Sequence, residues 1–455
     1  MGGLRGSHLF PPDQNALGFG RPATMSRVTR STDRGNYLFL VGVTVGLLLG
    51  VLVDRYFESE EWRLFQAVRN LVSETYVEEV EADELFLHSL EGMIGGLDRH
   101  SRLYVPEEVT RLDRETSGEF RGIGVVFRPP ASEMRILFSY PDSPAARAGI
   151  GTGDQIVAAN GREIASFEAN ELQNALQRGE TGTLELVVAD RHGTRREVSV
   201  IPEQVIDPSV RHAEVLDEEH KVGYLTILSF SNRTAGEFDE VMAHFEERGV
   251  ERLIIDLRGN PGGILEAGVA IANRFVAEGP LVVTETRNGT RTDRADSSKA
   301  RYVGMPVVLL VDENTASASE VLAGCLQDYG AAVIVGEETY GKGTVQTLSR
   351  IEKENLVIKL TTARYFTPLL RQLEREGEHR GLAPDIVFES TTRQRAEIYR
   401  HLARYSIPPS ARPAIEELEA ELEEELLPEA PDDPLLDFAL DLLTDSLAKR
   451  VEARD

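Results

Sequence analysis

Between residues 205 and 390, apolar strand-like runs alternate with helical patterns, and this rhythm constrains the fold more than any other feature of the sequence. The run Leu253-Ile254-Ile255-Asp256-Leu257 is nearly continuous in apolar residues, which is typical of a strand buried on both faces. Further strands are predicted at 222–230, 307–311 and 332–335, and helices at 236–247, 265–276 and 316–327. This order of elements predicts a layered α/β (α+β) core.

Residues 118–204 indicate a separate, mostly β module inserted before this core. A glycine-hinged run at 122–127 starts a strand, and Asn160-Gly161 is a strong hairpin turn. Other short strands are predicted at 136–138, 155–159, 183–188 and 195–201, and an amphipathic helix at 167–177. A length of about ninety residues suits one small domain.

The N-terminal part contains one uncharged stretch, residues 37–53, which is at the short end of what a membrane-spanning helix needs. Arginines precede it and acidic residues follow it, so the positive-inside rule predicts residues 1–36 in the cytoplasm. We therefore expect one transmembrane anchor in the cytoplasmic (inner) membrane, with the rest of the chain on the periplasmic side. A cleaved signal peptide and a buried core helix are the alternatives, and Met25 is an alternative start to Met1.

Helical patterns flank the two modules, at 58–112 and in the acidic, proline-interrupted C-terminal region 391–455. The acid-rich stretch at 416–425 is expected to be mostly solvated surface or tail. Either helical region could pack on a second copy of the chain, so a homodimer is a reasonable hypothesis.

The composition argues against several classes of function. A net charge of −27 disfavours nucleic-acid binding, because phosphate backbones select surfaces rich in lysine and arginine. A single cysteine, Cys325, excludes an intramolecular disulfide and a multi-cysteine metal site. The nine histidines fall in no metal-ligand spacing, so neither a metal nor an organic cofactor is expected.

A polar cluster, Asn314-Thr315-Ala316-Ser317-Ala318-Ser319-Glu320, follows a predicted buried strand and opens a helix. At that position unpaired N–H groups and the helix dipole favour negative charge, which suits a serine nucleophile whose attack creates an oxyanion. Serine and threonine are also preferred N-caps, so the cluster taken alone is better explained as an ordinary helix start.

The segment 336–346 contains Lys342 between two glycines. Its glycine and lysine spacing is close to that of a phosphate-binding loop, but Gly343 stands where a serine or threonine should bind magnesium, and 344–351 has strand composition. A nucleoside triphosphatase is therefore a weak hypothesis. Partial burial would disfavour the ammonium form of Lys342, and a neutral amine could then act as a general base. A surface lysine in a turn is the alternative.

A third motif, Asp256-Leu257-Arg258-Gly259-Asn260-Pro261-Gly262-Gly263, ends the most apolar strand. Loops at the carboxyl ends of such strands commonly form active sites, and N–H groups in this turn could complete an oxyanion hole. A tight strand-to-helix turn that needs glycine is the alternative explanation.

Together these motifs resemble the carboxyl-terminal processing peptidases, also called tail-specific proteases, over about residues 65 to 388. Further resemblance lies in Leu97-Asp98-Arg99-His100-Ser101, in 118–124, in 361–368 and in 382–386. The serine and the lysine are twenty-five positions apart, as in that family. Each motif is weak alone, but their shared order and spacing are highly specific.

The resemblance implies a role for each site residue. Ser317 corresponds to the nucleophile, Lys342 to the general base, and Gln346 to the residue that orients the lysine amine. The N–H groups of Ala318 and Gly262 correspond to the oxyanion hole, with Gly263 as a competing choice. Ser319 is a rival nucleophile by composition, but only Ser317 has the motif position.

The resemblance also implies that the 118–204 module is a PDZ domain, which binds a protein C-terminus as an added strand. Gly122, Ile123 and Gly124 would then form the loop that caps the terminal carboxylate, and Arg178 would couple peptide binding to protease activation. A cation at a helix C-terminus is the alternative for Arg178. We expect a serine endopeptidase that processes or degrades envelope proteins near their C-termini. The competing hypothesis is a catalytically silent peptide-binding scaffold.

Overall fold

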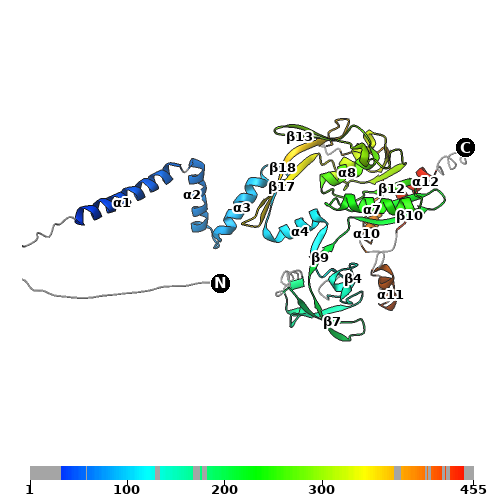
Figure 1. Ribbon diagram of the computed structural model, residues 1–455, viewed down its shortest axis with the longest axis horizontal. Helices are drawn as coiled ribbons and strands as arrows, with labels where there is room; N and C mark the ends of the chain where they lie inside the picture. The colour runs from blue at the N-terminus through cyan, green and yellow to red at the C-terminus, as the bar shows by residue number, and fades with distance from the viewer. Residues whose placement is uncertain are drawn as a thin grey trace, which may run out of the picture. The chain divides into compact units, whose positions relative to one another are not determined.

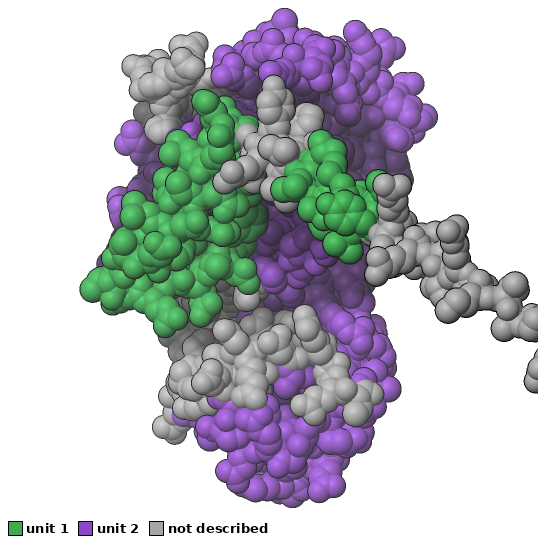
Figure 2. Space-filling model, turned by 90° about the vertical axis from the view of Figure 1, so that its left-hand side faces the viewer, with its two compact units in different colours: residues 1–88 green, residues 89–455 purple. Residues whose placement is uncertain are grey.

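The computed structural model describes residues 32–57, 59–128, 134–167, 175–176, 182–373, 381–404, 407, 411–422, 426 and 431–444. The chain divides into two compact units, residues 1–88 and 89–455, which Figure 2 shows in different colours. The expectations for residues 1–31, including the start at Met1 or Met25, lie outside the described residues.

The first unit is helical, as predicted. It contains α1 (Thr32–Phe57), α2 (Glu60–Thr75) and the start of α3 (Ala82–Gly95). The Ser59 side chain caps α2 by accepting a hydrogen bond from the Trp62 N–H at 3.2 Å. Residues 37–50 lie within α1 and are exposed. Among the described residues, no helix combines the length and the apolar character that crossing a membrane requires, so the anchor expected at 37–53 is not supported.

The second unit is built on a mostly parallel sheet, within the layered α/β core that the sequence predicts. Its strand order is β10-β11-β12-β15-β16-β19, with only β10 antiparallel to its neighbour. The bounds are β10 Val210–Asp217, β11 Val222–Ile227, β12 Arg252–Asp256, β15 Val307–Val311, β16 Val333–Gly336 and β19 Ile386–Val387. The strand expected at 222–230 ends at Ile227, and Phe230 instead forms an isolated bridge with Gly263.

Helices cover both faces of this sheet (Figure 1). Leu253 and Ile255 pack with α7 (Thr234–Glu247), α8 (Leu265–Phe275) and α9 (Ala318–Asp328). Ile254 points to the other face, where it packs with α10 (Thr392–Arg404) and α12 (Pro434–Leu443). Burial on both faces is the reason for the nearly continuous apolar character of β12.

A second, five-stranded sheet completes the core. It consists of β1 (Arg102–Tyr104), β13 (Pro280–Thr286), β14 (Gly289–Arg294), β17 (Thr344–Ile351) and β18 (Leu356–Phe366). The prediction of helix throughout 58–112 is wrong at β1, where Leu103 pairs with Ile358 of β18 and is buried. Three residues carry too little periodicity to reveal a strand whose partner is so distant in sequence. Helix α4 (Pro106–Ser117) follows β1.

The 118–204 module is mostly β, as predicted. Its strands are β2 (Glu119–Gly122), β3 (Val125–Phe127), β4 (Ile136–Ser139), β5 (Gln155–Ala159), β6 (Arg162–Glu163), β7 (Leu184–Ala189), β8 (Arg195–Val200) and β9 (Glu203–Ile206), with a short helix α5 (Pro144–Arg147). Asn160 and Gly161 both have positive φ in the turn between β5 and β6, which confirms the hairpin. Of the helix expected at 167–177, only Phe167 and residues 175–176 are described, and Arg178 lies outside the described residues.

The C-terminal region contains α10, α11 (Arg412–Leu422) and α12. The expectation that the acidic stretch is mostly solvated surface is confirmed for its described residues 416–422, of which only Leu418 is buried. Leu418 and Ile415, which lies just before the stretch, form a narrow buried face of α11. Ile415 packs with Phe138 and Val205 of the β module. The acidic side chains mask this narrow apolar face in the sequence, and only the distant β module reveals what it packs against.

Candidate active site

The two loops that carry the candidate serine and the glycine-rich motif lie side by side. They follow β12 and β15, which are parallel neighbours, so their carboxyl ends meet at one edge of the sheet. The Ala316 N–H donates to the Asn260 carbonyl at 3.0 Å, and the Thr315 hydroxyl donates to the Leu257 carbonyl at 2.9 Å. Residues some sixty positions apart in sequence are thereby joined by hydrogen bonds between buried groups.

Ser317 stands at the N-cap of α9 with φ 58° and ψ −117°. A residue with a side chain rarely adopts this conformation, which strains the backbone at the turn from strand to helix. Ser319 is fully buried within the first turn of α9, and its hydroxyl donates to the Asn260 carbonyl at 3.2 Å. The rival serine therefore has a structural partner and no access to solvent.

Gly262 lies against the start of α9. A β-carbon added there would lie 2.7 Å from the Ser317 Cβ and 2.9 Å from the Ala318 nitrogen, and φ is +93°, so only glycine fits. The Gly262 N–H donates to the Asn260 Oδ1 at 2.9 Å. Within the described residues, the N–H groups of Ala318 and Gly263 donate no hydrogen bond. Two unpaired donors therefore belong to segments that touch beside Ser317.

A buried carboxylate joins the serine segment to the lysine segment. Glu320 Oε2 accepts hydrogen bonds from the N–H groups of Ser317, at 2.7 Å, and of Lys342, at 2.9 Å. Its Oε1 accepts from the Thr339 hydroxyl at 2.6 Å and from the Gly341 N–H at 2.7 Å. Burial raises the pKa of Glu320 above its ordinary value, although these hydrogen bonds oppose the shift. One side chain thus fixes the backbones of both candidate catalytic residues.

Tyr365 of β18 makes a second link between the same two residues. Its buried hydroxyl lies within hydrogen-bond distance of the carbonyl oxygens of Ser317, at 3.2 Å, and of Lys342, and these two acceptors share its one proton. The Lys342 segment runs directly into β17, which begins at Thr344. No helix N-terminus follows Lys342, so the nucleoside triphosphatase hypothesis loses the feature that would bind phosphate.

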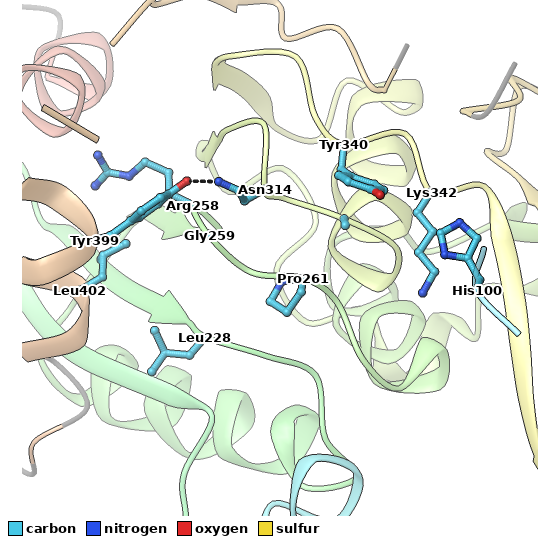
Figure 3. Close-up of a pocket in the computed structure, with 11 residues that line it drawn as sticks. His100, Leu228, Arg258, Gly259, Pro261, Asn314, Tyr340, Lys342, Tyr399 and Leu402 are labelled. Atoms are coloured by element: carbon cyan, nitrogen blue, oxygen red, sulfur yellow. Dashed lines mark hydrogen bonds between the residues drawn. The ribbon is translucent and has the colours of Figure 1, made fainter. Parts of the chain in front are cut away.

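Lys342 lines a cleft of about 620 Å³ (Figure 3). Figure 3 shows Lys342 and His100 at one end of the cleft, Tyr399 and Arg258 at the other, and Pro261 between them. The Tyr399 hydroxyl donates to Asp312 at 2.8 Å and accepts from the Asn314 amide at 2.5 Å. Helix α10 of the C-terminal region therefore contributes one wall, which the sequence did not reveal.

Gln346 lies in β17 beside an irregularity in the pairing of β17 with β18. Its Nε2 donates to the Thr344 hydroxyl at 3.0 Å and to the Thr361 hydroxyl at 3.3 Å. Within the described residues the side chain makes no other hydrogen bond, so Oε1 is left to accept.

In the β module, Gly122 ends β2, and Ile123 and Gly124 form the loop that leads to β3; all three residues are buried. A β-carbon on Gly124 would lie 2.3 Å from the Ser143 Cβ, so this position needs glycine. The Ile123 carbonyl accepts from the Ala145 N–H at 2.9 Å, whereas the N–H groups of Ile123 and Gly124 donate no hydrogen bond within the described residues. Such a loop can hold a carboxylate.

Sequence reasoning missed Glu320 and Tyr365. A signal existed for Glu320, because Ser317 and Glu320 have the spacing of a capping box, S-x-x-E. Tyr365 had no local signal, since its partners lie 48 and 23 positions away in sequence.

Comparison with known proteins finds two matching family models and several similar proteins. Peptidase family S41 matches residues 221–388, and the PDZ domain matches residues 139–190. The chain is 33% identical to "Carboxy-terminal processing protease CtpA" of Bacillus subtilis (strain 168) over 312 residues, which are 68% of this chain and 66% of that protein. It is 31% identical to "Carboxyl-terminal-processing protease" of Synechocystis over 352 residues, 76% of this chain and 79% of that one. The solved structure of a photosystem II D1 C-terminal processing protease is 26% identical, with a TM-score of 0.40, and the match covers 73% of this chain and 94% of that chain.

Proposed function

Because the chain belongs to the carboxyl-terminal processing serine proteases of peptidase family S41 and carries a PDZ domain, we propose that it hydrolyses peptide bonds with Ser317 as nucleophile and Lys342 as general base. The observation that carries the proposal is the pair of hydrogen bonds from the Ser317 and Lys342 N–H groups to the same Glu320 oxygen. Two residues that act on one proton need such a fixed separation.

In the proposed reaction the neutral Lys342 amine takes the proton of the Ser317 hydroxyl, whose oxygen attacks the scissile carbonyl. The resulting lysine ammonium then gives its proton to the leaving amine, and the substrate's acyl group stays on Ser317 as an ester. Water, deprotonated by the same amine, hydrolyses that ester and restores the enzyme. The partial burial of Lys342 supports a neutral amine, because desolvation disfavours the ammonium.

The Ala318 N–H is the first donor of the proposed oxyanion hole, since it opens α9 and donates to no described residue. Sequence analysis favoured Gly262 as the second donor. Its N–H is bonded to Asn260, so Gly263 is the better candidate in this conformation, and Gly262 could serve only after that bond breaks. The close approach of Gly262 to Ser317 supports either choice.

We further propose that the PDZ domain binds protein C-termini through Gly122, Ile123 and Gly124 and delivers envelope proteins for cleavage near their ends. The unpaired N–H groups of this loop support carboxylate capture. Arg178 as the link between peptide binding and activation stays a prediction from the sequence.

The location and the assembly of the protein are separate proposals. The arginines before the uncharged stretch 37–53 support a position of the protease on the periplasmic side of the cytoplasmic membrane, which proteolysis of spheroplasts would test. The exposed apolar side chains of α2, Leu64, Val68 and Leu71, support a homodimer, which sedimentation of the chain with all three changed to serine would test.

The decisive experiment compares the wild type with Ser317→Ala and Lys342→Ala on one protein substrate, presented with a free or an amidated C-terminus. Cleavage should be lost in both variants, whereas Ser317→Ala should still bind the free C-terminus. Cleavage that survives Ser317→Ala would overturn the assignment of the nucleophile. Binding without cleavage by the wild type, with every C-terminus offered, would favour the silent scaffold.

A further inference from the structure

The loop 97–101 is tied to β18 by a partly buried cluster of hydrogen bonds. Asp98 Oδ1 accepts from the N–H groups of His100, at 2.7 Å, and Ser101, at 2.9 Å. Asp98 Oδ2 accepts from the Ser101 hydroxyl at 2.7 Å. That hydroxyl in turn accepts from the Thr361 N–H at 3.1 Å, and the Thr361 hydroxyl donates to Asp98 Oδ1 at 3.1 Å. Asp98 thus holds a residue 263 positions away in sequence.

Because Asp98 is ionised, it determines which groups donate and which accept in this cluster of hydrogen bonds. Burial would raise the pKa of Asp98, but the hydrogen bonds from Ser101, His100 and Thr361 outweigh that effect and lower it. An ionised carboxylate only accepts, so the single proton of the Thr361 hydroxyl points at Asp98. The Thr361 oxygen can then only accept from its other neighbour.

That other neighbour is Gln346, whose carboxamide lies 3.3 Å from the Thr361 oxygen. An acceptor selects the NH₂ end of an amide, so Nε2 must face Thr361 and Oε1 must face away. The Thr344 hydroxyl, which is the second contact of Nε2 at 3.0 Å, does not determine the orientation of the amide, because it can either donate or accept.

We propose that Asp98 and Thr361 are positioning residues that fix the orientation of the Gln346 carboxamide, so that its carbonyl oxygen rather than its NH₂ group is offered to Lys342. This inference rests on the proposed function, in which Gln346 orients the lysine amine. The oxygen accepts a hydrogen bond from the amine and leaves the nitrogen lone pair for the serine proton. An NH₂ group in its place would compete for that lone pair and would disfavour the ammonium that forms during the reaction.

The test compares Thr361→Val, which removes the hydroxyl at nearly constant size, with Thr361→Ser, which keeps it. The matched control is Thr362→Val, because Thr362 makes a hydroxyl contact of 2.6 Å with Thr347 across the same two strands but touches neither Asp98 nor Gln346. Thr361→Val should lower kcat about tenfold with little change in KM, whereas Thr361→Ser and Thr362→Val should resemble the wild type. Asp98→Ala should add little further loss in the Thr361→Val background, because both act through one amide.

A second readout does not depend on turnover. In the Ser317→Ala background, the rate at which a trace amine reagent labels Lys342 is followed against pH by mass spectrometry. Thr361→Val should move the midpoint of that curve to lower pH by about half a unit or more, because the ammonium loses its acceptor. An unchanged midpoint and kcat in Thr361→Val, or equal effects in Thr362→Val, would overturn the inference while leaving the protease assignment intact. Absence of cleavage by the wild type would overturn the proposed function, and the labelling curve would still decide the orientation of the amide.

Discussion

The carboxylate of Glu320 accepts a hydrogen bond from the N–H of Lys342 at 2.9 Å, across 22 positions of sequence. The same oxygen accepts the N–H of Ser317. Glu320 is fully buried and takes no part in the proposed proton transfers. We explain the position of Glu320 by geometry, because its carboxylate sets the distance between the backbones of Ser317 and Lys342.

Glu320→Gln tests this geometry with a side chain of the same size. Each oxygen of the Glu320 carboxylate accepts hydrogen bonds from two donors. In Glu320→Gln the NH₂ group replaces one of these oxygens and must therefore face two donors instead of accepting from them. We expect kcat/KM to fall about a hundredfold and the free energy of unfolding to fall by about 1–3 kcal/mol. Kinetics and urea unfolding measure the two effects. Full activity in a stably folded Glu320→Gln variant would remove Glu320 from the positioning of the site.

The pH dependence of stability provides an independent check. The folded-state pKa of Glu320 is raised above its ordinary 4.5, chiefly by burial, so the folded protein holds this proton more tightly than the unfolded chain does. The stability that this carboxyl contributes is therefore complete below pH 4.5 and is lost as the pH rises through the folded-state pKa. The stability of the wild type relative to Glu320→Gln should fall as the pH rises through that window. Urea midpoints at a series of pH values measure it, and a relative stability that rises instead would contradict the sign.

The positive φ of Ser317 predicts an unusual order of stabilities. Ser317→Gly should unfold at higher urea concentration than Ser317→Ala, with a difference of about 1 kcal/mol, because glycine relieves the strain. Ser319 is the matched control, two residues on and inside α9. The Ser319→Gly variant should be less stable than Ser319→Ala by roughly 0.5–1 kcal/mol, because helix interiors disfavour glycine. The same order at both positions would mean that Ser317 is not strained.

Arg258 and Asp433 predict how the C-terminal region is held. Arg258 is buried between Asp256 and Asp433, with contacts of 2.6 Å to each. Burial alone would lower the pKa of Arg258, but the two carboxylates outweigh it and raise that pKa above its ordinary value. Asp433 also caps α12 by accepting from the Leu436 N–H at 3.2 Å. Asp433→Ala should cost about 2–4 kcal/mol of unfolding free energy, whereas the exposed neighbour Asp432→Ala should cost little. Equal unfolding midpoints for the two variants would show that the contact between Arg258 and Asp433 does not stabilise the C-terminal region.

The sequence by itself determined the elements whose pattern is local. Continuous apolar runs mark strands buried on both faces, as at Leu253–Leu257, and Asn160-Gly161 forms the hairpin turn it predicts. The order and spacing of the motifs were enough to indicate the family, because each motif depends on a few adjacent residues.

Only the tertiary structure decided which distant groups meet. Strand β1, the buried face of α11, and the roles of Glu320, Tyr365 and Thr361 all depend on partners far away in sequence. Periodicity reports that a side chain is buried, but it does not report which group the side chain faces. Polar positioning residues give no periodic signal, because a single hydrogen bond across the fold is enough to fix each of them.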